Sequence, residues 1–363
     1  YCSMHFVSLI KNDKIILRIE IEFMAKIRNL ALRDIPKLKK MISMISNLSS
    51  ADVSFGYKTY VPFPLNLINR FLPLRFKFAQ DSYVAIEDKK LCGLVTLKPQ
   101  EKNPQSWRIS KLFLDENGYD IGRQLVSFVI AKYGAMGANT FSVKVDESHE
   151  ELLELFSKGC GFRACSSEQL WKMEEIKLST PSLDKGFFRP FKNSDASVVA
   201  GIYNELIYPH FRYSLAKNPR EFENVLCSGL HDTSFFRYVI EDRSKHSIKG
   251  YFSIQTDDNE NFILNVDLVS AFDEYLSDVI NFSISQIMMR KRVFNLYFRN
   301  KKYQTNGTKT EKYLKENGFK NIKNQIVLVK DYYKRVQEDE RYSKPAIAFS
   351  EITRKPAFKS TLD

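Results

Sequence analysis

Two short segments carry side chains suited to contact an anionic or aromatic ligand. The segment Tyr208–Tyr213 (YPHFRY) interleaves aromatic rings with His210 and Arg212, a composition that suits stacking on a nucleotide or binding an acceptor. A buried aromatic cluster with a hydrogen-bonded histidine has the same composition, so both interpretations stay open. The run Arg290–Arg292 and the pair Lys301–Lys302 could contact phosphates, although such runs more often form a solvated face.

The common catalytic and nucleotide-binding motifs are absent from the sequence. It contains no P-loop lysine motif, no HExxH and no GxSxG. Its 5 cysteines include no CxxC pair, which favours neither a disulfide framework nor a zinc knuckle. Cys160 and Cys165 could be ligands, but two thiols without a nearby histidine are more typical of buried residues. We therefore predict no metal site, and these motifs assign no catalytic residue.

The composition is that of a globular chain with an excess of positive charge. The 363 residues are 44% hydrophobic and 27% charged, with a net charge of +12, and this length suggests about two domains. The excess favours anionic partners such as nucleotides, nucleic acid or acidic lipid. No apolar run reaches the roughly 18 residues of a membrane span, so no transmembrane segment is expected. With the unpaired cysteines, this predicts a reducing cytoplasm.

Two stretches of the chain repeat the same order of elements. Asp34 and Asp195 each precede a predicted helix, Asp34 as a plausible cap, and a predicted β-hairpin follows each helix. Further on, each stretch has a helix that closes on Gly-Phe, at Gly161 and at Gly318, and then a strand. The offsets are 161 residues between the aspartates and 157 between the glycines. This similarity predicts an internal duplication.

The repeat sets the predicted domain boundaries. The first domain spans residues 24–178 and the second 186–335, with a linker at 179–185 and a mobile tail at 336–363. Residues 1–23 precede Met24, a plausible start, so we interpret them as an over-extended reading frame or a partly ordered strand. Two interpretations remain for the segment Pro62–Gln80. It covers the first sheet as a helix and loop, or it binds a membrane surface or partner.

From Ser106 to Met173 the chain resembles the GNAT acyltransferase superfamily. The residues that carry the resemblance are WRISKLFLDENGYDIGRQLV from Trp107, a helix to Tyr133, the strand FSVKV, a second helix and Gly-Phe. The resemblance implies an α/β fold of two tandem domains, each a mostly antiparallel mixed sheet flanked by helices. It also implies that acetyl-CoA binds at the turn after the central strand, where a helix N-terminus presents backbone N–H groups to the pyrophosphate.

On the family pattern Arg/Gln-x-x-Gly-x-Gly/Ala, Asn117 takes the first position, Asp120 the first glycine and Gly122 the second. The Asp120 carboxylate would repel the pyrophosphate, and Arg123 could offset part of that repulsion. Gly122 could instead be a close-packing position. The residues that the resemblance assigns to acetyl-CoA are Leu112, Phe113, Leu114, Asn117, Gly118, Tyr119, Asp120, Ile121, Gly122 and Arg123.

The resemblance leaves the catalytic groups unassigned and weakens toward the C-terminus. Ser157 stands where many family members carry a tyrosine that protonates the coenzyme thiolate, and a serine hydroxyl is a poor general acid. Asp115 and Glu116 lie near the strand end but could equally be solvated. In the second copy, the turn Ala271–Leu276 has no glycine and Leu314 takes the tyrosine position. This copy is expected to lack the coenzyme grip and to be structural or to bind the acceptor.

Two functions of different kinds remain. The first is an N-acetyltransferase that moves an acetyl group from acetyl-CoA to an amine of a small molecule or a protein. The second is an inactive GNAT-fold module that binds a protein or a nucleic acid. For both functions, a nucleic acid is the less favoured partner. Asp120, Ser157 and the altered second copy favour the binding module.

Overall fold

The computed structural model describes most of the chain, with gaps. The described residues are 4–11, 14–21, 25–44, 81–88, 90–100, 103–115, 118–176, 187–223, 234–242, 247–256 and 259–332. The predicted linker 179–185, the predicted tail 336–363, the segment Pro62–Gln80 and the residue Asn117 lie outside them. Within the segment 1–23, β1 (Met4–Lys11) and β2 (Lys14–Ile21) form an antiparallel hairpin.

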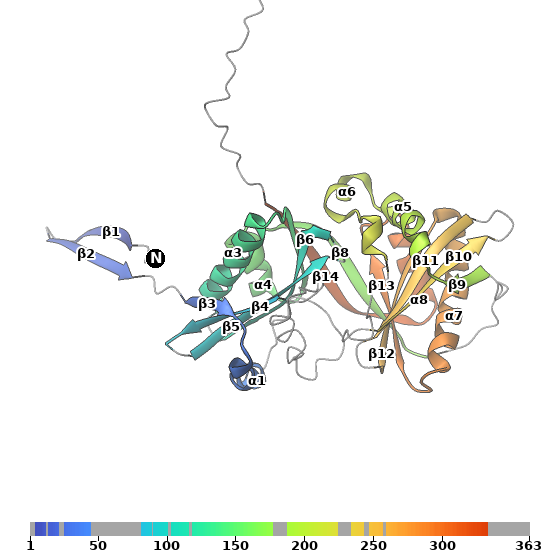
Figure 1. Ribbon diagram of the computed structural model, residues 1–363, viewed down its shortest axis with the longest axis horizontal. Coiled ribbons are helices and arrows are strands. Elements are labelled where there is room, and N and C mark those ends of the chain that lie inside the picture. The colour runs from blue at the N-terminus through green and yellow to red at the C-terminus, as the bar shows by residue number, and fades with distance from the viewer. Residues whose placement is uncertain are drawn as a thin grey trace, which may run out of the picture. The chain divides into compact units, whose positions relative to one another are not determined.

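The first copy contains the elements from β3 to β8 (Figure 1). They are β3 (Lys26–Asn29), η1 (Leu32–Asp34), α1 (Ile35–Met44), β4 (Asp81–Glu87), β5 (Lys90–Gln100), β6 (Asn103–Leu114), α3 (Tyr119–Ala135), β7 (Thr140–Asp146), α4 (Glu150–Glu154), the π-helix η2 (Leu155–Gly159) and β8 (Arg163–Met173).

The second copy repeats this order from β9 to β14, and among the described residues it also has α6, η5 and η7. Its elements are β9 (Phe188–Pro190), η4 (Asn193–Asp195), α5 (Ala196–Leu206), α6 (Pro209–Leu215), η5 (Pro219–Glu221), β10 (Ser234–Asp242), β11 (Ser247–Thr256), β12 (Asn261–Leu268), η7 (Ser270–Tyr275), α7 (Leu276–Met288), β13 (Asn295–Lys301), α8 (Gly307–Glu316) and β14 (Phe319–Asp331).

The same ion pair fixes the start of each copy. The Arg28 guanidinium donates to both carboxylate oxygens of Asp34 at 2.6 and 2.7 Å, and Arg189 does the same to Asp195 at 2.8 and 3.0 Å. Each carboxylate also accepts a backbone N–H three residues upstream. The pair ties the first strand of each copy to its first helix. The expected cap at Asp34 takes another form, because its carboxylate accepts the upstream Ala31 N–H, and Asp195 likewise makes no side-chain cap bond to α5.

In the described part of the chain, 12 strands of the two copies form one sheet, in the order β3-β4-β5-β6-β7-β14-β8-β13-β12-β11-β10-β9. Among these 12 described strands, β6–β7 and β12–β13 pair in parallel and the other pairs are antiparallel. The fold class that the resemblance implied, a mostly antiparallel mixed sheet flanked by helices, is confirmed.

The last strand of each copy lies beside the other copy. β14 pairs with β7 and β8, and β8 in turn pairs with β13. The strand next to β7 therefore comes from the second copy, and the strand next to β13 comes from the first. The cores follow this exchange: Leu328 of β14 packs in the core of the first copy, and Trp171 of β8 packs in that of the second.

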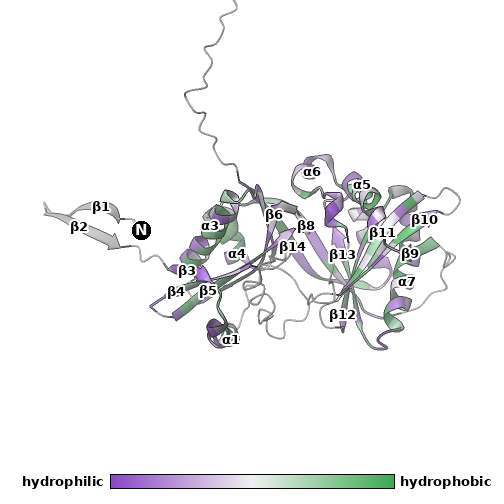
Figure 2. Cartoon of the chain, viewed as in Figure 1, coloured by the Kyte–Doolittle hydropathy of each residue, from purple (hydrophilic) through white to green (hydrophobic). Residues whose placement is uncertain are grey.

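Helices cover both faces of the sheet in each copy. In the first copy, Val95 and Leu112 pack in the core beneath α3 and α4, while their strand neighbours Leu94 and Phe113 pack with α1. Adjacent residues of a strand point to opposite faces, so α1 and α3 lie on opposite sides (Figure 1). Figure 2 shows hydrophobic residues interspersed with hydrophilic ones along these elements, as two-sided packing requires.

Candidate functional site

A β-bulge separates the end of β6 from its neighbour β7. The β5–β6 register skips Ser110, which is therefore the extra residue of the bulge. On its other edge, β6 pairs with β7 only from Ser106 to Ile109. The bulge thus coincides with the point where two parallel strands diverge, and the C-terminal end of β6 has a free edge toward β7.

Two backbone donors point into this gap. The N–H of Asp115 donates to the Cys92 carbonyl of β5 at 3.0 Å. Because N–H groups alternate between the two edges of a strand, those of Leu112 and Leu114 point to the β7 side. The Leu112 side chain is buried beneath α3, and that of Leu114 packs against the same core. Such fixed donors can stabilise a carbonyl oxygen that gains negative charge.

Helix α3 begins directly after β6 and carries a second set of donors. Gly118 is its N-cap, and no side chain caps the helix there. The first intrahelical bond runs from the Gly122 N–H to the Gly118 carbonyl at 2.7 Å. The N–H groups of Tyr119, Asp120 and Ile121 therefore have no partner within the helix. Together with the helix dipole, they suit an anion.

Both glycines of this turn are required by packing. A Cβ at Gly118 would lie 2.6 Å from the Leu114 Cβ and 2.8 Å from the Asp115 carbonyl oxygen. A Cβ at Gly122 would lie 2.8 Å from both Leu114 and Leu155 side-chain carbons. The close-packing explanation for Gly122 thus has a physical basis, and the contacts also bring the helix start against the end of β6.

The charged residues of the turn face solvent. The Asp120 side chain is 75% exposed and lies 3.5 Å from the Arg123 guanidinium. The Tyr119 hydroxyl reaches the π-helix, because a Cβ at Gly159 would lie 2.8 Å from it. Ile121 packs toward the core. The turn therefore presents one carboxylate, one guanidinium and one phenol around the free N–H groups.

The position expected for a catalytic tyrosine holds a hydroxyl that is already engaged. Ser157 lies in the π-helix and donates to the Leu153 carbonyl at 2.6 Å. Asp115, a candidate base, forms an ion pair with Lys90 at 2.5 Å. Neither group is placed as a free acid or base. The described part of the first copy therefore identifies backbone N–H donors for a ligand, but it identifies no residue that would transfer a proton.

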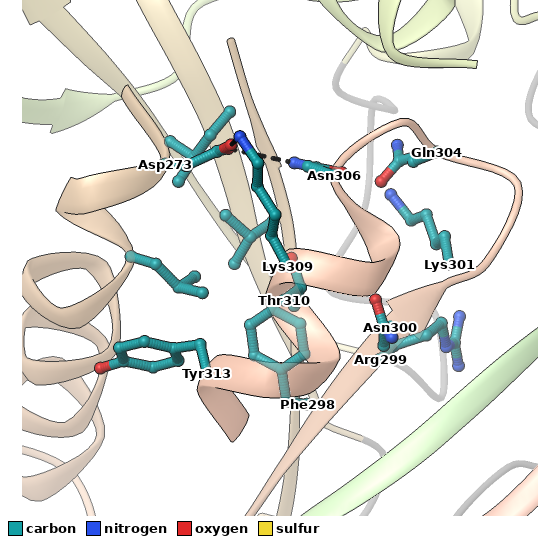
Figure 3. A pocket seen from close by; sticks show the side chains of 13 residues that line it. Asp273, Phe298, Arg299, Asn300, Lys301, Gln304, Asn306, Lys309, Thr310 and Tyr313 are labelled. Carbon is teal, nitrogen blue, oxygen red and sulfur yellow. Dashed lines mark hydrogen bonds and ion pairs between the residues drawn. The ribbon is translucent and has the colours of Figure 1, made fainter. Parts of the chain in front are cut away.

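The equivalent part of the second copy contains a cavity of about 50 Å³ (Figure 3). It lies where β12 and β13 diverge, since they pair only from Asn261 to Leu264 on β12. Figure 3 shows Lys309 of α8 extending toward Asp273 of η7. The Lys309 ammonium lies 3.6 Å from that carboxylate, and Asn306 also donates to it at 3.5 Å. These contacts connect the start of α8 to the turn before α7.

A buried charge network lines the inner wall of this cavity. Lys301 of β13 donates to Asp267 of β12 at 2.6 Å, and Gln304 donates to the same carboxylate oxygen at 2.6 Å. Burial lowers the pKa of Lys301 below its ordinary value, although Asp267 opposes the shift. Lys301, Asp267 and Gln304 thus satisfy one another's polar groups.

A second buried network joins the two copies. The Glu168 carboxylate of β8 accepts from Lys144 at 2.6 Å and from the Tyr303 hydroxyl at 3.0 Å, and Arg299 lies 3.8 Å away. Burial alone would raise the pKa of Glu168, but the nearby cations Lys144 and Arg299 hold it well below its ordinary value. The carboxylate is therefore charged, and its partners come from both copies.

The comparisons with known proteins rest on structure alone. No protein-family model matches the chain, and no curated protein matches it in sequence. A tandem GNAT protein from the clavulanic acid biosynthesis pathway, solved without AcCoA, superposes with a TM-score of 0.54 at 12% identity, over 84% of this chain and 98% of that one. The chain has the tandem GNAT fold. A GCN5-related N-acetyltransferase from Sphaerobacter thermophilus also superposes on it, with a TM-score of 0.51 at 11% identity, over 84% of this chain and 95% of that one.

The two GNAT-like copies differ at the connection between the central strand and the following helix. In the first GNAT copy, the central strand β6 leads through Gly118 into α3. In the second, β12 leads through the 3₁₀-helix η7 into α7, and Val279 is buried in the first turns of α7. The predicted second copy without a glycine turn is thus confirmed as a GNAT-like unit of altered turn geometry.

Other segments singled out from the sequence have no role in this GNAT-like site. Tyr213 of α6 is 74% exposed, and His210 stacks on Tyr208 with an interplanar angle of 19°. The segment Tyr208–Tyr213 therefore lies at the surface with His210 and Tyr213 exposed, while Phe211 packs against the core of the second copy, so the segment as a whole is not a buried cluster. Arg212 donates to two backbone carbonyls, which explains its presence without a ligand. Cys160 is buried and Cys165 half-buried, both as free thiols.

The buried charges were missed in the sequence because a charged residue within a strand usually marks an exposed face. An alternating pattern could have located Glu168 opposite the apolar face of β8, but not its partners. Among the described residues, no group of His, Cys, Asp and Glu side chains suits a metal ion. Across the same ranges, the helices are too short or too polar to cross a bilayer.

Proposed function

We propose that this chain is an N-acetyltransferase whose first copy takes acetyl-CoA as co-substrate and transfers the acetyl group to an amine. The observation that carries the proposal is the juxtaposition of two donor sets. The Leu112 and Leu114 N–H groups lie on the free edge of β6, and four residues separate that strand from Tyr119, where the free N–H groups of α3 begin. Contacts of Leu114 with the helix start hold the two sets together.

Each donor set has one task in this proposal. The N–H groups of Tyr119, Asp120 and Ile121 hold the pyrophosphate at the positive end of the helix dipole. The N–H of Leu112 or Leu114 holds the carbonyl oxygen of the thioester, which gains negative charge when the amine attacks its carbon. The nitrogen–carbon bond forms, the carbon–sulfur bond breaks, and the amine proton leaves to solvent or to the thiolate.

Phe113 and Asp120 have supporting and opposing roles. Phe113 is buried on the α1 side of β6, where it fixes the strand that carries the donors. The Asp120 carboxylate lies on the first turn of α3, where it opposes a pyrophosphate. Its exposure allows water and salt to screen the repulsion, and Arg123 at 3.5 Å offsets part of it. The residues thus fit the co-substrate with reduced affinity.

The second copy is assigned a structural or acceptor-binding role. Its cavity of about 50 Å³ has room for a few water molecules rather than a coenzyme. The pairing of Asp273 with Lys309 and Asn306 occupies the turn that faces that cavity. The acceptor is a small molecule or a protein amine, and we propose the cytoplasm as the compartment.

One observation favours the second candidate, an inactive binding module. Ser157 donates to its own helix, and Asp115 is paired with Lys90, so neither of these two groups is available to transfer a proton. In that case the basic surface of the chain would bind a protein partner or, less favoured, a nucleic acid.

Calorimetric titration of the full chain with acetyl-CoA tests the proposal. We expect one binding site, with hydrogen exchange slowed at the amides of residues 118–123 and unchanged at those of residues 270–278. Mass spectrometry of a panel of amines with acetyl-CoA then identifies the acceptor class. An absence of heat at millimolar acetyl-CoA would reject the proposal. Binding without turnover of any amine, together with capture of one protein or a salt-sensitive nucleic-acid complex, would support the binding module.

A further inference from the structure

The connection between α7 and β13 exposes apolar and basic side chains together. Met288, Met289 and Val293 are 41%, 73% and 82% exposed. The residues between them are Arg290, Lys291 and Arg292, a run that the proposed acetyl transfer does not use. We refer to Met288–Val293 as the α7–β13 patch. Exposed apolar groups gathered at one place mark an interaction surface more often than exposed groups scattered singly.

The exposure of this patch is built into the fold. Phe294, the next residue, is buried and packs edge-on against Phe262 at 5.8 Å. The Arg290 guanidinium lies 3.8 Å from the centre of the Phe236 ring. The Met289 N–H and the Lys291 N–H bond back to the last turn of α7. With both ends anchored, Met289 and Val293 have no route into the core.

The charge of the patch selects its partner. It contains 3 cations, and of these only Lys291 forms a described ion pair, with Glu260 at 3.6 Å. That pair is exposed and therefore weak. Apolar side chains flanked by cations suit the interface of a bilayer, where the apolar groups enter the acyl boundary and the cations meet phosphate groups. A nucleic acid would use the cations but leave Met289 and Val293 in water.

The corresponding connection of the first copy lacks this combination. It joins α3 to β7 through Met136–Asn139, where Met136 is 64% exposed and no residue is basic. Met136 is thus exposed to an extent similar to Met289, but of these two connections the one in the second copy carries the cations. Met136 therefore supplies a matched control.

We propose that the α7–β13 patch binds the surface of a bilayer that contains anionic phospholipid. The patch lies at the C-terminal end of α7, and the cavity of the second copy lies at the other end. A helix of 13 residues is about 20 Å long, so a bound membrane leaves the cavity accessible. The proposal is independent of acetyl transfer.

Co-sedimentation of the full chain with phosphatidylcholine vesicles, with and without phosphatidylserine, tests the proposal. We expect binding only with phosphatidylserine and a decrease as salt rises. Met289→Ser with Val293→Ser should lower the partition at least about tenfold, and Arg292→Gln about fivefold. Met136→Ser should leave it unchanged. A Val293→Trp variant should show a blue-shifted emission when these vesicles are added, because its ring enters the apolar boundary.

Three results would overturn the proposal. The first is an absence of binding that depends on phosphatidylserine. The second is equal binding by the Met289/Val293 and Met136 variants, or a loss only with Arg292→Gln, which would indicate a purely electrostatic surface for a nucleic acid or acidic protein. The third is self-association of the wild-type chain that the Met289/Val293 variant abolishes, which would assign the patch to a second copy of the chain.

Discussion

The two copies differ most at the turn between the central strand and the following helix. In the first copy, a bulge at Ser110 precedes Gly118, and backbone N–H groups at both the strand edge and the helix start lack partners in their own elements. In the second, the described β11–β12 register runs without a bulge, and Asp267, Lys301 and Gln304 satisfy one another. The same strand-to-helix connection can thus present N–H donors to a ligand, as in the first copy, or lie beside polar side chains that pair with one another, as in the second.

The copies also share a part that belongs to neither alone. Strands β8 and β14 pair with each other at the centre of the sheet, and each completes the sheet of the other copy. Substitutions in β8 or β14 should therefore affect the stability of both copies. Substitutions in the turns test the difference between the copies separately.

The largest effect is expected at Glu168. Glu168→Gln keeps the shape of the side chain but leaves Lys144 and Arg299 near a neutral group, so we expect a loss of about 3–5 kcal/mol in the free energy of unfolding. Urea denaturation measures this loss. Asp120→Asn, which changes an exposed carboxylate, is the control and should change stability by less than about 0.5 kcal/mol. Similar losses in both variants would show that the central network carries no special weight.

Leu328→Ala tests the exchange of strands. Leu328 belongs to the second copy by sequence but packs in the core of the first, so its truncation should cost about 2–5 kcal/mol and destabilise both copies together. Fluorescence of Trp107 and Trp171 and circular dichroism should report one coincident transition. Ile322→Ala, on an exposed part of the same strand, is the control. Two separated transitions would contradict a shared centre.

The repeated aspartates should respond alike to acid. Hydrogen bonds from Arg189 lower the pKa of Asp195; at Asp34, burial would raise the pKa, but the bonds from Arg28 and the Ala31 N–H outweigh it. At pH values between the folded and the unfolded pKa of each aspartate, the unfolded chain therefore binds more protons than the folded chain. The stabilisation is complete above an unfolded pKa of about 3.9 and is lost as pH falls through the folded pKa.

Urea midpoints measured across this acid range check the aspartates. Asp34→Asn and Asp195→Asn should each cost about 1.5–3 kcal/mol near neutral pH and flatten the acid limb to a similar degree. If only one of them flattens it, the two ion pairs are not equivalent.

The smallest effect is expected from substitutions that compare the turn before α3 with the turn before α7. Asp120→Gly removes a carboxylate from the proposed pyrophosphate site, so acetyl-CoA should bind about five- to thirtyfold more tightly, from a repulsion of about 1–2 kcal/mol. Glu274→Gly, in the turn of the second copy, should leave the affinity unchanged. Calorimetric titration of both variants measures this. Equal affinity in wild type and Asp120→Gly, together with a Gly122→Asp chain that is only less stable, would mean that the Gly118–Gly122 turn serves packing alone.

Local patterns in the sequence predicted the duplication, and the family resemblance over residues 106–173 predicted the fold class. Asp34 and Asp195 mark helix starts because each carboxylate accepts the backbone N–H three residues upstream and closes the turn that leads into the helix. Gly161 and Gly318 mark helix ends because each adopts a positive φ, +70° and +74°, that other residues rarely take. Such signals depend on a few neighbouring residues, which is why both copies could be predicted from the sequence.

The strand exchange and the central charges were decided only by the tertiary structure. The alternation of β8 and β14 indicates two-sided burial but not which strand lies beside them, since many registers bury the same apolar faces. Glu168 meets Lys144 across 24 residues and Tyr303 across 135, and a carboxylate in a strand gives no sign of such distant partners. Pairing between distant segments depends on the packing of the whole chain, so no local pattern contains it.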